Sequence, residues 1–190
     1  MPTRLLRESE VAFARQVFEE HLPYDRVYLS DRFFPFNEKT ETAVTAASLA
    51  TFIPSRSLRS YTIFVGPEVY GEGADGPRFR DTFVHELTHV WQGYHGLLGW
   101  AYMAQSMLSQ GYAVLTRGDR NKAYDYEPGA AWDDYNVEQQ ALIVQDWYLN
   151  GMREDDERFI YIAGHIRAAE GRAATPKAPG AKRSSPRAKW

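Results

Sequence analysis

The residues of this chain best suited to chemistry lie in the segment RDTFVHELTHVWQGYHG, from Arg80 to Gly96. His85 and His89 are four residues apart, and Glu86 directly follows the first histidine. Residues i and i+4 lie one turn apart on the same face of a helix, so both imidazole rings can bind one ion. Glu86 would lie beside that ion without binding it, placed to accept a proton from water and pass it to a leaving group. The pattern therefore predicts a hydrolytic zinc site.

The residues around the two histidines favour a helix with one buried face. An apolar stripe would face the core, made of Phe83, Leu87, Val90, Trp91 and Tyr94. The alternative is that His85 and His89 are ordinary, partly buried histidines on an unrelated helix. Two of the five histidines of the chain lie in this one motif, and we therefore favour zinc binding.

The residue that completes the site is open on spacing alone, and His95 is the first candidate. It follows His85 by the spacing of the third histidine in the signature HExxHxxGxxH. That signature needs a glycine where this chain has Gln92, and Gly93 comes one residue late. If the helix continued, His95 would lie about 9 Å along the axis from His89. Only a shifted turn would bring it to the metal.

The second candidate is a carboxylate on a later helix, in DDYNVEQQALIVQDWY. Between Asn136 and Tyr148 only Glu138 and Asp146 carry charge. A lone glutamate in a well-packed helix needs a partner, and a metal ion would be a strong one. Glu138 could equally be a solvated charge that the helix dipole stabilises.

HELTHVWQ together with the later NVEQQALIVQDWY resembles the zincin-type metallopeptidase domains of bacterial secretion effectors, including those of some type VI secretion spike proteins and Rhs-type toxins. The resemblance covers roughly Tyr61 to Arg167. It implies that His85, His89 and Glu138 bind Zn²⁺ and that Glu86 is the general base. It also implies a secreted bacterial toxin that associates with secretion machinery and has a cognate immunity protein.

An oxyanion stabiliser is the remaining part that a zinc peptidase needs, and a tyrosine commonly supplies it. Tyr124, Tyr126 and Tyr135 lie just before Glu138. We favour Tyr126, although all three could be structural aromatic residues. Asp146 could orient a zinc-binding histidine, or could equally serve as a cap or a surface ion-pair partner.

The elements that must position these residues indicate an α+β domain with a zincin-like arrangement. In that arrangement the strand in Arg59–Glu68 is the edge strand beside the zinc helix, where an extended peptide substrate would pair. Asp81 is the expected N-cap of the zinc helix. The chain pattern predicts a helix over 8–21, a strand over 26–31, an ambiguous segment over 39–53, a glycine-rich loop over 69–79, the zinc helix over 82–91, a helix over 100–110, a hairpin over 112–129, and helices over 133–148 and 155–169.

Composition and charge narrow the class of protein. All 25 acidic residues precede Gly171, whereas six of the 22 basic residues follow it. The acidic body is a poor nucleic-acid binder. The absence of cysteine excludes disulfides and thiolate ligands. We expect a metallopeptidase domain over 1–170 and a disordered basic tail over 171–190.

The N-terminal residues lack the apolar core of a secretory signal, and no run is long enough to span a bilayer. We therefore expect synthesis in the cytoplasm and, if the protein is secreted, a type VI-like route. The expected function is zinc-dependent hydrolysis of a peptide or protein substrate. The alternatives are a zinc-binding interaction module without turnover, and a zinc amidase that acts on a non-protein amide such as peptidoglycan.

Overall fold

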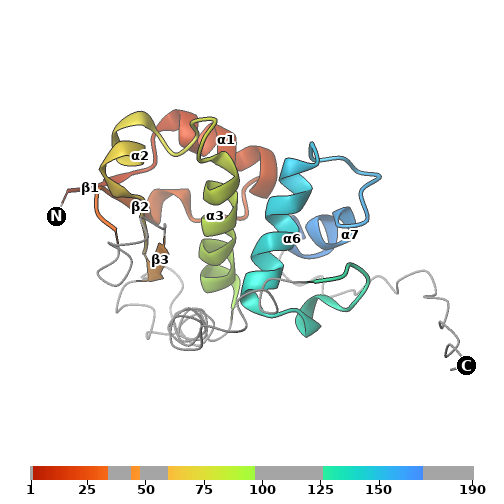
Figure 1. Ribbon diagram of the computed structural model, residues 1–190. Coiled ribbons are helices and arrows are strands. Elements are labelled where there is room, and N and C mark those ends of the chain that lie inside the picture. The colour runs from red at the N-terminus through yellow and green to blue at the C-terminus, as the bar shows by residue number, and fades with distance from the viewer. Residues whose placement is uncertain (1, 34–43, 48–59, 97–125, 169–190) are drawn as a thin grey trace, which may run out of the picture.

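The computed structural model describes residues 2–33, 44–47, 60–96 and 126–168 (Figure 1). These residues form short strands and helices, which confirms the α+β class. The elements in chain order are β1 (Thr3–Leu5), α1 (Glu8–Phe18), a 3-10 turn (Tyr24–Arg26), β2 (Val27–Ser30), β3 (Val44–Ala47), β4 (Tyr61–Phe64), α2 (Gly66–Glu72), α3 (Arg80–His95), a 3-10 turn (Trp132–Asp134), α6 (Val137–Leu149), α7 (Phe159–Tyr161) and a π-helical turn (Ile162–Ile166).

The described strands form one mixed sheet in the order β1-β2-β4-β3. β2 pairs with β4 in parallel, whereas β1 and β3 pair antiparallel with their neighbours. The prediction that the strand before the zinc helix is an edge strand is therefore wrong. β4 pairs on both sides, so its backbone groups are used within the sheet, and the described edges are β1 and β3. Strand β3 also resolves the ambiguous segment over 39–53 as far as that segment is described, and it lies next to α3.

The helix predicted to carry the zinc ligands is longer than predicted and begins at a different residue. Helix α3 continues without a break to His95, and its N-cap is Phe79 rather than Asp81. The glycine-rich segment before it is partly helical, since α2 covers Gly66–Glu72. Pro67 occupies the first turn of α2, where its fixed φ angle favours a helix start. Gly73 then ends α2 at a φ of 114°, a conformation that glycine adopts readily.

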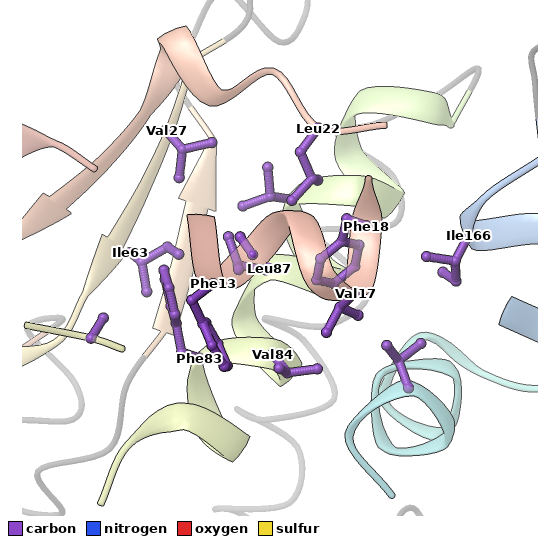
Figure 2. Close-up of a cluster of buried hydrophobic side chains, with 14 of the residues drawn as sticks. Phe13, Val17, Phe18, Leu22, Val27, Ile63, Phe83, Val84, Leu87 and Ile166 are labelled. Atoms are coloured by element: carbon purple, nitrogen blue, oxygen red, sulfur yellow. The ribbon is translucent and has the colours of Figure 1, made fainter. Parts of the chain in front are cut away.

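The main core lies where α1 and α3 cross the inner face of the sheet (Figure 2). Phe13 of α1 stacks on Phe83 of α3, with ring centroids 6.1 Å apart. Ile63 of β4 and Leu87 of α3 are fully buried in the same cluster. The buried positions of Phe83 and Leu87 confirm the apolar stripe predicted for this helix. Because this stripe packs on the core, the face of α3 that carries His85 and His89 is turned toward α6.

Helix α6 lies against α3 on the side away from the sheet (Figure 1). The predicted helix over 133–148 starts later than expected, because a 3-10 turn comes first and the Asn136 side chain then caps α6. The Asn136 Oδ1 atom accepts from the backbone N–H groups of Glu138 and Gln139, each at 3.0 Å. The predicted helix over 155–169 is shorter and spans only Phe159 to Ile166, as a turn of α-helix followed by a π turn.

The predicted helix over 100–110, Tyr124, most of the predicted hairpin and the basic tail lie outside the described residues. Within the part of the chain that the structure describes, no helix combines the length and apolar character needed to cross a bilayer.

Candidate metal centre

Two histidines of α3 and one glutamate of α6 meet between the two helices. The His85 and His89 rings lie edge to face, with centroids 4.9 Å apart. Glu138 reaches both rings from the first turn of α6. Its Oε2 atom is 3.3 Å from His85 Nε2 and 3.6 Å from His89 Nε2. One ligand atom from each residue lies within 4.8 Å of the other two, so the three residues can share one ion.

The spacing of these atoms fits a tetrahedral ion. Ligand atoms about 2.0–2.1 Å from such an ion lie roughly 3.3 Å from one another, close to the two distances to Glu138. His89 Nε2 is buried and has no hydrogen-bond partner among the described residues. A buried polar nitrogen without a partner is costly, and a bound cation would satisfy it. Two imidazoles and one carboxylate form a ligand set that suits zinc.

The electrostatics of the three groups also favour a cation. Burial raises the pKa of Glu138, but the two neighbouring imidazoles outweigh this effect and the pKa falls below its usual range. Burial lowers the pKa of His89, yet the adjacent Glu138 carboxylate, with a contribution from Glu86, raises it to about 9. The Glu138 carboxylate thus favours positive charge at the point where it meets the two imidazoles.

Glu86 lies within the same buried region but does not belong to the ligand set. Its exposed fraction is 5%, and its charge acts on His89. The side chain of His85 is 14% exposed, against 7% for His89 and 5% for Glu138. The His85 side is thus the more open one.

Two glutamines that the sequence interpretation missed hold the other nitrogen of each ring. His85 Nδ1 lies 3.1 Å from Gln145 Oε1, and His89 Nδ1 lies 2.8 Å from Gln92 Oε1. Asp146 instead accepts a hydrogen bond from Tyr126, and its neighbour Gln145 is the residue that contacts His85. The available signal was helical spacing: Gln92 follows His89 by three residues, and Gln145 follows Glu138 by two turns.

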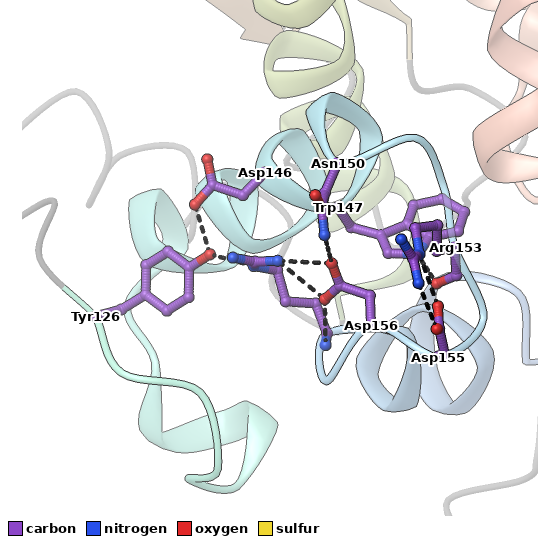
Figure 3. A network of polar contacts seen from close by, with 8 residues as sticks. Tyr126, Asp146, Trp147, Asn150, Arg153, Asp155 and Asp156 are labelled. Atoms are coloured by element: carbon purple, nitrogen blue, oxygen red, sulfur yellow. Dashed lines mark hydrogen bonds and ion pairs between the residues drawn. The ribbon is translucent and has the colours of Figure 1, made fainter.

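Tyr126 belongs to a separate polar network at the C-terminal end of α6 (Figure 3). Its hydroxyl donates to Asp146 Oδ2 at 2.6 Å and accepts from Arg158 Nε at 3.0 Å. Burial and the bond to Asp146 raise the pKa of Tyr126. Arg158 also binds Asp156, at 2.8 Å.

The remaining candidates have other contacts. Tyr135 donates its hydroxyl hydrogen to the Glu127 carbonyl oxygen. His95 Nε2 lies 2.8 Å from the His21 carbonyl oxygen, and its ring stacks on Trp91. Because α3 continues past His89, His95 is not part of the ligand cluster. Trp91 packs against the core, as expected.

The chain is similar to known proteins of one kind. It is 32% identical over 155 residues to the type VI secretion system spike protein VgrG2b of Pseudomonas aeruginosa. The match covers 77% of this chain and 13% of the spike protein, so the chain spans a small part of that relative's length. The solved effector domain of P. aeruginosa VgrG2b is similar at 33% identity and a TM-score of 0.55, over 83% of this chain and 81% of the domain. No protein-family profile matches the chain.

Proposed function

Because the chain belongs to the family of the VgrG2b effector domain, we propose that it is a zinc-dependent peptidase with a zincin-like active site, delivered as a type VI secretion effector. The single observation that carries the enzymatic part is the meeting of His85, His89 and Glu138 beside the buried Glu86. The delivery part rests on the relative being a secretion spike protein. An immunity protein in the producing cell and a peptide or protein substrate belong to the same proposal.

His85, His89 and Glu138 would hold the zinc ion through two Nε2 atoms and a carboxylate oxygen. When bound, zinc would polarise the scissile carbonyl and make a water molecule more acidic. The side chains that surround the ligands exclude other water from most directions, since His89 and Glu138 are both buried. The substrate would therefore approach from the more exposed His85 side.

Glu86 is the proposed general base. It is buried on α3 and its charge acts on His89, so its carboxylate lies near the ligand cluster, to which it does not belong. A buried carboxylate beside a cation can accept the proton of the attacking water and then donate it to the departing amine. A site with a purely structural role would have no need of this carboxylate, and its position therefore favours hydrolysis.

Tyr126 remains the proposed oxyanion stabiliser, with a condition that the structure adds. Its hydroxyl belongs to the separate network with Asp146 and Arg158, so the tyrosine would have to leave these partners and move toward the ligand cluster to reach a substrate oxygen. We therefore expect Tyr126 to contribute less to hydrolysis than Glu86 does.

The test compares Glu86→Gln with Glu127→Gln, a change at an exposed carboxylate outside the site. Peptide hydrolysis and zinc content are measured in both variants and in the wild type. We expect Glu86→Gln to keep its zinc and to lose hydrolysis by about 10²–10⁴-fold, while Glu127→Gln behaves as the wild type. Equal hydrolysis in all three proteins would contradict the assignment of Glu86.

The substrate class is tested in the same experiment with a peptide mixture and with peptidoglycan fragments. Cleavage of peptides supports the peptidase. Cleavage of peptidoglycan fragments alone would replace it with a zinc amidase that uses the same residues. A wild-type protein that binds zinc and cleaves neither substrate would indicate an interaction module without turnover.

A further inference from the structure

The two glutamines beside the histidines have orientations that their other partners fix. Gln92 Nε2 donates to the Val137 carbonyl oxygen at 2.9 Å and to Gln140 Oε1 at 3.0 Å. A carbonyl oxygen can only accept, so the nitrogen of the Gln92 amide must face Val137. Its oxygen therefore faces His89 Nδ1, and that ring nitrogen must carry the hydrogen.

The same reasoning applies to the second ring. Gln145 Nε2 donates to the Asp81 Oδ2 atom at 3.1 Å, and a carboxylate oxygen accepts. The Gln145 oxygen consequently faces His85 Nδ1, at 3.1 Å. Both rings are thus held with hydrogen on Nδ1, so that the Nε2 atoms, which face Glu138, are the ones left for a metal ion.

Gln92 is held, directly and through Gln140, by hydrogen bonds to backbone carbonyl oxygens. Gln140 receives a hydrogen bond from Gln92 and uses its own nitrogen to donate to the carbonyl oxygens of Trp132 and Tyr135, at 3.0 and 3.3 Å. Gln92 and Gln140 are 5% and 3% exposed. The chain of amides joins α3 to the turn that precedes α6, and it fixes the approach of Glu138 to His89.

We propose that Gln92 and Gln145 are positioning residues that hold both histidines in the tautomer required for zinc binding. This inference rests on the metal site of the proposed function. An amide is the side chain that meets both needs, because it accepts from the imidazole at one end and donates to an acceptor at the other. Since amides are neutral, they orient the rings without adding negative charge beside Glu86 and Glu138.

The test separates the accepting and the donating role of Gln92. Methionine at position 92 would remove both roles, whereas glutamate would still accept from His89 but could no longer donate to Val137. We expect Gln92→Met to weaken zinc binding by about 10- to 100-fold, the usual effect of losing a partner that orients a ligand. Gln92→Glu should be less stable yet bind zinc far more tightly than Gln92→Met.

Gln145→Met provides the same test at a half-buried position, where folding is less at risk. Gln16→Met, at an exposed glutamine of α1, is the matched control. Zinc affinity is measured by competition with a chromophoric chelator, at a temperature at which circular dichroism shows each variant folded. We expect Gln145→Met to lose affinity in the same range and Gln16→Met to lose none.

Nuclear magnetic resonance of the ring nitrogens reads the tautomer directly. The zinc-loaded wild type should show a slowly exchanging Nδ1–H for both His85 and His89, and Gln92→Met should lose only the signal of His89. A wild type that binds zinc while both methionine variants match Gln16→Met in affinity would overturn the positioning role alone. A wild type that binds no zinc would overturn the metal site and this inference together.

Discussion

Two buried glutamates, Glu10 and Glu138, differ in what surrounds them. Glu10 is fully buried, and its carboxylate accepts two hydrogen bonds from the Arg4 guanidinium, at 2.7 and 2.8 Å. It also accepts from the backbone N–H groups of Arg7 and Ala74, at 2.7 and 2.9 Å. Glu138 instead faces two imidazoles, one of which has a buried nitrogen without a hydrogen-bond partner among the described residues. Burial of a charge is common to both sites, so the partners distinguish them: an arginine at Glu10, and at Glu138 two imidazoles, which are groups that can bind a metal ion.

The largest effect on stability should come from Glu10. The carboxylate joins β1, the residue before α1 and the segment just after α2. Removal of one partner from a buried ion pair leaves the other charge uncompensated, and we expect Glu10→Gln to lower the free energy of unfolding by about 3 kcal/mol. Chemical denaturation measures this loss. A loss no larger than that of the exposed control Glu127→Gln would contradict the role of Glu10 as a stabilising buried ion pair.

The dependence of folding stability on acidic pH tests the same ion pair of Glu10. Burial raises the pKa of Glu10, but its hydrogen bonds from Arg4, Arg7 and Ala74 outweigh burial and lower it. A carboxylate with a lowered folded-state pKa stabilises the protein above its unfolded pKa, and this contribution is lost as pH falls through the folded value. Below the ordinary glutamate pKa, the wild type should therefore lose stability more steeply than Glu10→Gln. Parallel curves in the two proteins would contradict the ion-pair assignment.

At the ligand site, pH should act on binding. Since the pKa of His89 is raised to about 9, we expect its ring to be protonated at neutral pH without metal and to lose that proton when zinc binds. We expect apparent zinc affinity to rise about tenfold per pH unit up to that value, with release of about one proton at pH 7. Calorimetric titration in two buffers of different ionisation enthalpy measures the release. Equal binding enthalpies in the two buffers would show that no proton is released, and would place the metal elsewhere.

The smallest effect should come from the network at the end of α6 (Figure 3). Tyr126→Phe removes the hydrogen bonds to Asp146 and Arg158, and because the group is half-buried we expect a loss of about 1 kcal/mol. Thermal unfolding measures it. Hydrolysis by this variant distinguishes its two roles: a loss of rate beyond the loss of folded protein supports oxyanion stabilisation, and an unchanged rate leaves Tyr126 as an anchor only.

The two histidines were predicted from a local signal, whereas Glu138 was favoured over His95 only by the resemblance to secretion effectors. The spacing of His85 and His89 defines one helix face, and Glu138 follows a capping residue at the start of another helix. The shared site of the three residues is the part of the sequence interpretation that the geometry supports. Only the packing of α6 on α3 brings Glu138 to the two histidines, so spacing along the sequence could not decide between Glu138 and His95.

The features that the sequence did not reveal depend on contacts between distant segments. The inner position of β4 follows from its parallel pairing with β2, which no local pattern encodes. Asp146 was considered in place of Gln145, and neighbouring residues on a helix point about 100° apart. The choice between them is set by which one faces His85, a residue on another helix.

Zinc content per chain tests the central claim most directly. The wild type, Glu138→Gln, His95→Ala and Glu10→Gln are dialysed against a mild chelator, and zinc is measured in the folded protein. The account predicts about one zinc per chain in all but Glu138→Gln, because Glu138 completes the site while Glu10 and His95 do not take part. Retention of zinc in Glu138→Gln, or its loss in His95→Ala alone, would contradict the site between α3 and α6.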